Sequence, residues 1–351
     1  MNFAVEVREI SSILKRVLPF VGKVDVQKNI LLKINKNDLI VKAHNEAMSI
    51  TAKGKILSND EFDVVVEGRK FEKYVNAFDD YIDIEVKDNI LTLKENKSKL
   101  QLPIITNEFY PEKPSTIIEN RIEFPLVNFT NGIKKVIDFA NKEIKSEATT
   151  QGINLDFCKN KLNISATNGN FLSICEYDIT DDLEVNLTIP IWLAQEIAKY
   201  NDENFVIYPS ERTIKFEFEN IEIISSALGG KFPKIKEIIP EGYENNVTFD
   251  KKELENIFKK IDLIKDEDMT AIYFDFDKEN AKVKYTTKNG IFEDTISCNL
   301  KGKCDLIKLS YKYLPIIMNN LEEKVTFEYE QDGYLILFRN KNNRMVLAVC
   351  K

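Results

Sequence analysis

The pattern of apolar and polar residues alternates between a helical period and a strand-like period several times along the chain. Residues 8–21, "REISSILKRVLPFV", carry apolar side chains every three or four positions, which predicts an amphipathic helix. Strand-like runs follow at "ILLKI", "DLIVKAH" and "AMSITAKG". A second helical segment, "GRKFEKYVNAFDD", precedes the alternating run "YIDIEVKDNILTLKENKSKLQLPI". The first third of the chain is therefore predicted to order its elements as helix, strands, helix, strands.

The same order occurs three times. The second copy starts near Glu119 and has its helical segments at "FPLVNFTNGIKKVIDFANKEI" and "PIWLAQEIAKY". The third has them at "TFDKKELENIFKKIDLI" and "SYKYLPIIMNNL". We therefore predict an α+β chain of three tandem pseudo-repeats, in which two amphipathic helices cover one face of an antiparallel sheet. The predicted domains are residues 1–117, 118–246 and 247–351.

Short echoes between the copies support this division. The segments "VKAHNEAMSI", "ISATNGNFLSI" and "VKYTTKNGIFEDTI" each read as a strand, a polar turn and a strand. Two of these turns contain Asn168-Gly169 and Asn289-Gly290, residue types that tolerate a positive φ. We expect hairpins at these places.

Two stretches that combine an aromatic residue with proline end the first and second copies. They are "TNEFYPEKP" at Thr106–Pro114 and "GGKFPKIKEIIP" at Gly229–Pro240. Proline cannot donate to a strand ladder, so we interpret both as exits from a repeat. A phosphate-binding loop would need Gly-Lys-Ser/Thr before a helix, whereas Phe-Pro follows the Gly-Gly-Lys here.

Length and charge limit the function classes. A chain of 351 residues suits two or three domains, and 49 basic against 57 acidic side chains give a formal charge of −8. Any contact with DNA must therefore come from a local basic surface. The sequence has no apolar stretch long enough to cross a bilayer, and its first residues are too charged for a signal peptide, so we expect a cytoplasmic protein.

The sequence gives little evidence for catalytic or metal-binding residues. The five cysteines include no C-x-x-C pair, which favours free thiols over disulfides or a zinc site. The single histidine, His44, has no arrangement of nucleophile and base around it in sequence. The carboxylates of "DEDM" and "FDFDKEN" lack the spacing of a calcium loop. We predict no catalytic residue, no metal and no cofactor.

Four segments together resemble the bacterial sliding clamp family, the β subunit of DNA polymerase III. They are "LPIITNEFYPEKP", "SATNGNFLSI", "GGKFPKIKEIIP" and "MVLAVCK", in the family's order and spacing. The resemblance implies the DNA clamp fold and a homodimer closed head to tail into a ring lined by helices. It also implies a non-catalytic processivity factor for DNA replication that encircles double-stranded DNA without reading its sequence. Partners would be the DNA polymerase, clamp-loader subunits and repair proteins.

The resemblance implies that basic residues on the helices face the DNA. Lys23, after Gly22, matches a position where the family carries a basic DNA-contacting residue. The alternative is that these side chains merely solvate exposed helices. The candidates are Lys15, Arg16, Lys23, Arg69, Lys73, Lys134, Lys135, Lys142, Lys199, Lys259 and Lys260.

A second implied site is an apolar pocket near the C-terminus that holds Leu and Phe side chains from the tails of partner proteins. The alternative reading of its apolar members, such as Leu172, Ile238 and Val346, is ordinary core. The residues carried over are Thr150, Thr167, Gly169, Leu172, Pro233, Ile238, Tyr313, Val346, Leu347 and Val349.

Several positions depart from the family pattern. The segment from Thr167 to Leu172 lacks the frequent His-Arg pair, and Ala348, Cys350 and Glu237 stand where proline, arginine and arginine are common. These changes alter the expected pocket and its partner specificity. Further departures thin the expected DNA-facing charge, at Ile191, Trp192 and Glu147. A divergent clamp paralogue, or a mobile-element clamp acting as a protein-docking scaffold, is the alternative function.

Overall fold

The computed structural model describes residues 1–105, 110, 120–142, 147–201, 205–266, 271–304, 306–331 and 333–350. Most of the Thr106–Pro114 stretch, part of the "DEDM" segment and the predicted boundary at residue 117 lie outside these residues. Contacts divide the chain into two compact units. Unit 1 comprises Met1–Leu126 and Asn201–Ala227, and unit 2 comprises Val127–Tyr200 and Leu228–Lys351.

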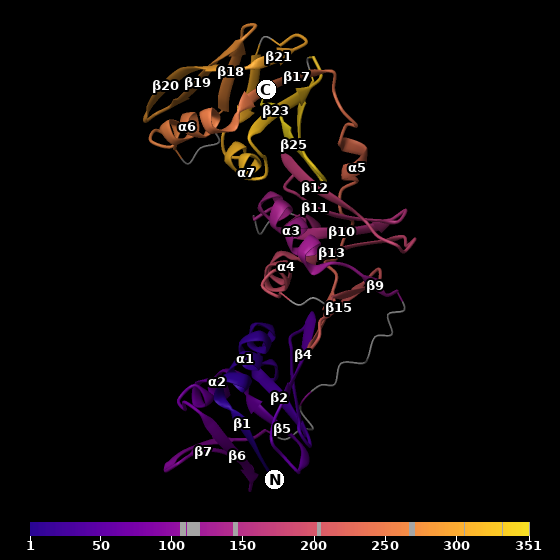
Figure 1. Cartoon of the computed structure of the whole chain (residues 1–351), viewed down its shortest axis with the longest axis vertical. Helices are drawn as coiled ribbons and strands as arrows, with labels where there is room; N and C mark the ends of the chain where they lie inside the picture. Colours follow the sequence, from indigo (N-terminus) through magenta and orange to yellow (C-terminus); the bar gives the residue numbers. More distant parts are fainter. Residues whose placement is uncertain are drawn as a thin grey trace. The chain divides into compact units, whose positions relative to one another are not determined.

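Among the residues that the structure describes, the six predicted helices are confirmed, and a seventh helix is present that was not predicted (Figure 1). The short helix α5 forms within "GGKFPKIKEIIP", a stretch that was interpreted as an exit from a repeat and not predicted to contain a helix. The helices are α1 (Val7–Val17), α2 (Gly68–Val75), α3 (Leu126–Val136), α4 (Ile191–Ile197), α5 (Ile235–Ile238), α6 (Lys251–Ile261) and α7 (Leu314–Asn319).

Local chemistry explains where these helices begin and which face they bury. In α6 the carboxylate of Asp250 accepts hydrogen bonds from the backbone N–H groups of Lys252 and Glu253, which caps the first turn. Proline occupies the first turn of α7, where its missing N–H costs nothing. The apolar stripe of α1 is buried, as predicted from its spacing, through Val7, Ile10, Ile13, Leu14 and Val17.

Unit 1 contains an eight-stranded antiparallel sheet and a four-stranded one. The orders are β5-β2-β3-β4-β16-β15-β14-β9 and β1-β6-β7-β8. Ile50 of β4 pairs with Ile223 of β16, so strands of the first and second copies share one sheet. The strands are β1 (Asn2–Glu6), β2 (Asn29–Asn35), β3 (Asp38–His44), β4 (Met48–Lys55), β5 (Glu61–Glu67), β6 (Tyr81–Lys87), β7 (Ile90–Glu95), β8 (Ser98–Pro103), β9 (Ile122–Glu123), β14 (Val206–Pro209), β15 (Thr213–Glu217) and β16 (Ile221–Ser226).

Unit 2 repeats this arrangement with nine and four strands. The orders are β13-β10-β11-β12-β25-β24-β23-β17-β21 and β20-β19-β18-β22. Leu172 of β12 pairs with Val346 of β25, which joins the second copy to the third. The strands are β10 (Gly152–Cys158), β11 (Lys161–Thr167), β12 (Phe171–Asp178), β13 (Val185–Pro190), β17 (Asn245–Asp250), β18 (Ala271–Phe276), β19 (Asn280–Thr287), β20 (Gly290–Ser297), β21 (Asn299–Lys301), β22 (Leu306–Ser310), β23 (Lys324–Tyr329), β24 (Leu335–Asn340) and β25 (Asn343–Ala348).

The predicted α+β class with antiparallel sheets is confirmed, but each copy divides its strands between two sheets rather than one. A period of two predicts a strand without saying which strand it pairs with, so this division was not visible in the sequence. The predicted boundary at residue 246 falls inside β17, and the three predicted domain ranges stay a prediction. The expected positive φ occurs at Gly169 (91°) and Gly290 (156°).

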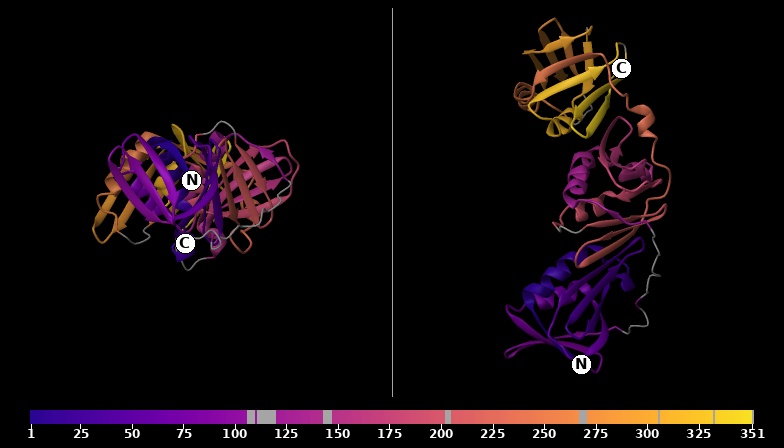
Figure 2. Two further views of the ribbon diagram at one scale, coloured as in Figure 1. Left: turned by 90° about the horizontal axis from the view of Figure 1, so that it is seen from below. Right: turned by 45° about the vertical axis from the view of Figure 1, so that its right-hand side comes forward.

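In unit 2, α3 and α5 lie on opposite faces of the nine-stranded sheet (Figures 1 and 2). On one face of β12, the hydroxyl of Ser173 donates to the carbonyl of Lys135 in α3. On the other face, Leu172 and Ile174 pack against Ile235 of α5. The alternation of β12 therefore places α5, and the pocket beside it, on the face away from α3.

Candidate peptide pocket and basic helices

A small apolar cavity of about 130 Å³ lies in unit 2, between α5 and the junction of β12 with β25. Its floor comes from the sheet and one wall from α5 and Pro233. The lining residues are Thr150, Thr167, Gly169, Asn170, Phe171, Leu172, Pro233, Ile235, Ile238, Leu335, Val346 and Ala348.

Seven of the ten predicted pocket residues line this cavity, although they come from four separate parts of the chain. They are Thr150, Thr167, Gly169, Leu172, Pro233, Ile238 and Val346. The structure therefore brings together most of the residues that the resemblance implied. Their role in binding peptides stays a prediction.

The other three predicted residues do not line the cavity. Leu347 lies between Val346 and Ala348 on β25, so the strand's alternation points it to the opposite face, where it is 1% exposed. Val349 lines a different cavity, of about 520 Å³. Tyr313 stacks on Phe171, with 4.1 Å between ring centroids, and so lies behind one lining residue.

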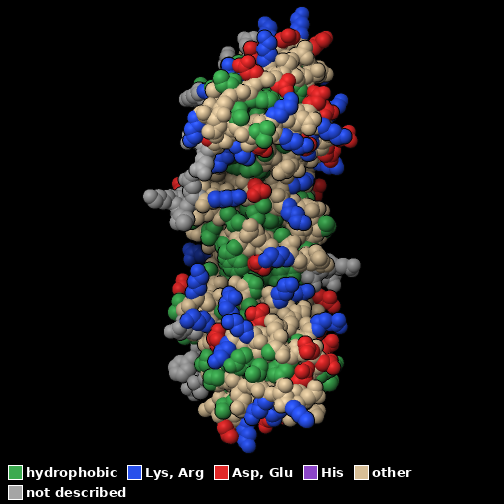
Figure 3. Space-filling view, turned by 90° about the vertical axis from the view of Figure 1, so that its left-hand side faces the viewer, with side chains coloured by type: hydrophobic (Ala, Val, Ile, Leu, Met, Phe, Trp, Pro, Cys, Tyr) green, Lys and Arg blue, Asp and Glu red, His purple; other side chains and the backbone are tan. Residues whose placement is uncertain are grey.

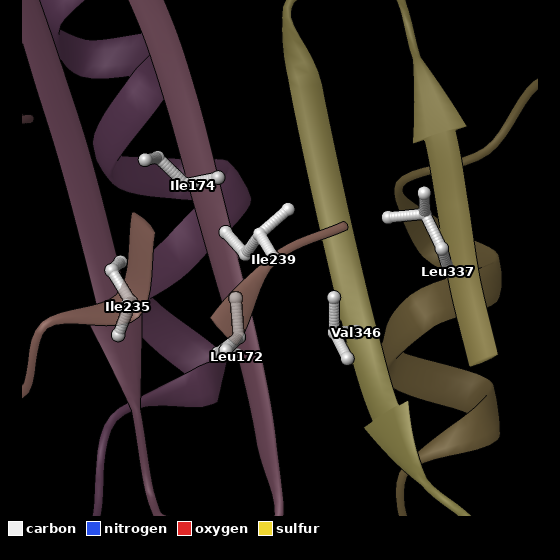
Figure 4. Packing of buried hydrophobic residues seen from close by; sticks show 6 residues of the cluster. All are labelled: Leu172, Ile174, Ile235, Ile239, Leu337 and Val346. Carbon is white, nitrogen blue, oxygen red and sulfur yellow. The ribbon is translucent and has the colours of Figure 1, made fainter. Parts of the chain in front are cut away.

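The floor of the pocket is also part of the hydrophobic core. Figure 4 shows six side chains converging from β12, β24, β25 and the α5 segment: Leu172, Ile174, Ile235, Ile239, Leu337 and Val346. Leu172 is 6% exposed and Val346 is 2% exposed, so these two serve as core and as floor together. Ile238 differs, because 47% of it is exposed to solvent. An apolar ligand would cover that surface.

A hydrogen-bonded turn holds the rim of the pocket. The carboxamide oxygen of Asn168 accepts from the backbone N–H groups of Asn170 (3.0 Å) and Phe171 (3.1 Å). The hydroxyl of Thr167 donates to the carbonyl of Phe171 at 2.9 Å. With Gly169 in the left-handed region, these bonds define the turn between β11 and β12.

Sequence reasoning missed five of the lining residues, Asn170, Phe171, Ile235, Leu335 and Ala348. Ile235 belongs to the short α5, for which the sequence offers only four residues of pattern. Leu335 does follow an alternating run, "YLILF", but its contact with the pocket depends on where β24 lies in the sheet. Glu237, one of the departures from the family, pairs with Lys234 at 2.9 Å.

The candidate DNA-facing residues lie on or just after the helices. Ten of the eleven are exposed, and Lys135 is half-buried because its ammonium donates to the carboxamide of Asn342 at 3.1 Å. Lys142 and Lys260 form ion pairs with Asp138 (3.5 Å) and Asp294 (2.8 Å), and Lys199 pairs with Glu196. Figure 3 shows one face of the molecule, on which Lys and Arg side chains lie among Asp and Glu. The basic surface is therefore partly neutralised by acidic neighbours.

A polar cavity of about 490 Å³ brings Lys134 and Lys135 of α3 near α7. Its lining is rich in asparagine, a feature that no sequence motif indicated. The lining residues are Asn128, Asn131, Lys134, Lys135, Asp138, Tyr177, Ile316, Asn319, Asn320, Leu321, Asn340 and Asn342.

Within the described residues, no three His, Cys, Asp or Glu side chains are grouped as a metal site would require. The helices of that part of the chain are all too short or too polar for a transmembrane span.

Comparison with known proteins shows which family the chain belongs to. Residues 1–114 match the N-terminal domain of the DNA polymerase III beta subunit, and residues 125–234 match its central domain. The "Beta sliding clamp" of Mycoplasmopsis pulmonis is 22% identical over 330 residues, covering 92% of this chain and 85% of that protein. That of Bacillus subtilis is 22% identical over 300 residues, covering 82% and 79%.

Solved structures show the same fold. The DNA polymerase III subunit beta of Pseudomonas aeruginosa superimposes with a TM-score of 0.92 at 18% identity, with full coverage of both chains. Caulobacter crescentus pol III beta also gives 0.92, at 17% identity. The two family domains follow one another in the expected order over most of the sequence, and we conclude that this chain belongs to the DNA polymerase III β subunit family, the bacterial sliding clamps.

Proposed function

We propose that this protein is a DNA sliding clamp, a non-catalytic processivity factor that encircles duplex DNA and tethers the replicative polymerase. The observation that carries the proposal is the match of the N-terminal and central β subunit domains, in order, along one chain. Curated sliding clamps that align with over nine tenths of the chain support it.

Encirclement explains how a protein with a net negative charge can stay on DNA. A closed ring holds the duplex by topology, so its inner surface needs only weak contacts with phosphates, and these permit sliding. Exposed basic residues on the helices, such as Lys15 and Arg16 on α1, would supply those contacts. The acidic residues that give the whole chain its net charge of −8 would lie mainly elsewhere and limit non-specific adhesion.

The ring requires two copies, and the sheet edges suggest how they join. In each four-stranded sheet one terminal strand has further backbone contacts: β1 bonds to Leu57, and β22 bonds to Val349 and Cys350. The opposite edges are β8 and β20. We propose that β8 of one copy pairs with β20 of the other, because edge strands offer unpaired backbone groups. Exposed Ile291 on β20 would be covered by this contact.

The pocket beside α5 would bind the apolar tails of polymerase and clamp-loader subunits. Its lining is mostly apolar, and the turn at Asn168 keeps its rim in place. The half-exposed Ile238 offers a surface that gains from being covered. We place this function in the cytoplasm, where replication takes place.

Retention on circular DNA tests the proposal. The protein would be loaded onto nicked circular DNA by the clamp loader of its own organism with ATP, separated from free protein by gel filtration, and then treated with a restriction enzyme. We expect it to elute with the circle and to be released when the circle is cut. Equal retention on circular and cut DNA would show that it grips DNA rather than encircling it. Light scattering should give twice the chain mass.

A further inference from the structure

A cysteine, a lysine and an aspartate meet beside the pocket, and nothing in the clamp function uses them. Cys158 ends β10, and Lys236 belongs to α5, 78 residues later. The Lys236 Nζ atom lies 2.8 Å from Cys158 Sγ and 2.6 Å from Asp156 Oδ2. The carboxamide of Asn163 also donates to Cys158 Sγ, at 3.6 Å. Thiol, amine and carboxylate are therefore held in one cluster.

We propose that this cluster is an oxidation site, at which peroxide joins Cys158 to Lys236 through a sulfur–nitrogen bond. Both side chains are accessible: Lys236 is 45% exposed, and the cysteine is partly exposed. The thiolate is the form of a cysteine that attacks peroxide, and the partial exposure of Cys158 gives peroxide access to its sulfur.

The reaction has two balanced steps. The thiolate sulfur of Cys158 attacks one oxygen of hydrogen peroxide, the O–O bond breaks, and a sulfenic acid forms. The departing hydroxide takes up the proton that the thiol lost and becomes water. The amine of Lys236 then attacks that sulfur, the S–O bond breaks, and the hydroxide leaves as water after taking a proton. In total, one thiol, one amine and one peroxide give one S–N crosslink and two waters. A thiol reductant reverses the crosslink by attacking its sulfur.

Asp156 positions the lysine for the second step. Burial lowers the pKa of Lys236, but its hydrogen bonds to Asp156 and Cys158 together outweigh burial and raise that pKa. The amine must therefore lose its proton as it attacks, and the carboxylate 2.6 Å away is placed to accept it. The flexible lysine side chain needs only a small shift from its observed contact with sulfur.

Burial disfavours the reactive thiolate form at three other cysteines. Burial raises the pKa of Cys175 to about 12, and burial also raises the pKa of Cys298 and of Cys350. A raised pKa keeps a thiol protonated and slow to react with peroxide. These three thiols are therefore expected to react slowly with peroxide.

The crosslink would restrain the wall of the pocket, a consequence that rests on the proposed function. Ile235 and Ile238 flank Lys236 on α5 and line the cavity. At about 130 Å³ the cavity is smaller than ligand pockets usually are, about 300 Å³ or more, so a bulky apolar tail requires α5 to move outward. A bond from α5 to β10 opposes that movement, and oxidation should weaken peptide binding.

Mass spectrometry tests the site without reference to DNA or peptides. The purified full chain would be treated with hydrogen peroxide, measured intact, and digested. We expect a product two hydrogen masses lighter than the reduced protein, a crosslinked peptide pair containing Cys158 and Lys236, and reversal by dithiothreitol. Lys236→Arg should abolish the crosslink while keeping the ion pair to Asp156, and should leave a sulfenic acid that dimedone traps. Lys234→Arg is the matched control and should crosslink normally.

The proposal is overturned if the wild type stops at the sulfenic acid, or if Lys236→Arg gives the same lighter product. Fluorescence anisotropy with a labelled peptide ending in Leu-Phe tests the effect on the pocket. Oxidation should raise Kd by about threefold or more in the wild type, because apparent Kd varies inversely with the open fraction, and should not raise it in Lys236→Arg. An unchanged Kd in the crosslinked protein overturns the restraint of the pocket. Failure of the reduced protein to bind the peptide counts against the proposed pocket function instead.

Discussion

Replacing Ile238 by alanine is expected to weaken peptide binding about as much as it weakens the fold. The substitution removes three carbon atoms, worth together about 2.4 kcal/mol if fully buried. In the free protein 47% of Ile238 is exposed, so a bound peptide covers the part that remains. That part corresponds to about 1.1 kcal/mol, or a sixfold rise in Kd, and the already buried part to about 1.3 kcal/mol of folding free energy.

Fluorescence anisotropy measures this change directly. The probe is a fluorescein-labelled peptide ending in Leu-Phe, and the same peptide ending in Ala-Ala reports non-specific adhesion. Leu263→Ala is the matched control, since Leu263 is 84% exposed in the same unit and does not line the pocket. Its Kd should equal that of the wild type. If Ile238→Ala leaves Kd unchanged, or if Leu263→Ala raises it equally, the peptide does not cover Ile238 and the reasoning is refuted.

Three further predictions concern stability, measured by urea unfolding. Gly169→Ala should lower the free energy of unfolding by about 1 kcal/mol, because Gly169 has a φ of 91° that alanine adopts only with strain. Gly229→Ala is the control and should leave stability unchanged, since its added Cβ contacts no other atom. Equal effects of the two substitutions would contradict the prediction. Tyr311→Phe should lower the free energy of unfolding by about 1–2 kcal/mol, because it removes a hydroxyl that donates to the carbonyl of Phe258, near the end of α6, at 3.0 Å. An unchanged free energy of unfolding would show that this hydrogen bond does not stabilise the fold. Hydrogen bonds from Lys260, which has the larger effect, and from the backbone N–H of Thr295 lower the pKa of Asp294 below its usual 3.8. The lowered pKa of Asp294 stabilises the fold slightly. This stabilisation is complete above pH 3.8 and is lost as the pH falls through the pKa of Asp294 in the folded protein, so the difference in unfolding free energy between the wild type and Asp294→Asn should shrink in acid. A difference that stays constant with pH would contradict the prediction.

The sequence alone determined the three copies, the six longer helices and most of the residues at the pocket. Helical periodicity is a local property: the apolar residues of α1 recur every three or four positions whatever the helix packs against, so its buried face could be predicted. The turn at Gly169 was likewise visible, because Asn-Gly tolerates the backbone conformation that it requires. The resemblance to the clamp family then located Pro233, Ile238 and Val346 around one site.

Only the tertiary structure decided how strands are shared between sheets and which side chains meet across long separations. The exclusion of Leu347 from the pocket depends on the register of β25 against β12, and a change of one residue would exchange the two faces. The contact of Lys236 with Cys158 depends on α5 lying over the sheet, and it joins residues 78 positions apart. The periodicity of apolar residues indicates only whether each side chain faces the protein core or the solvent. The identity of the partner across that interior is set by packing between distant segments, which no local pattern contains.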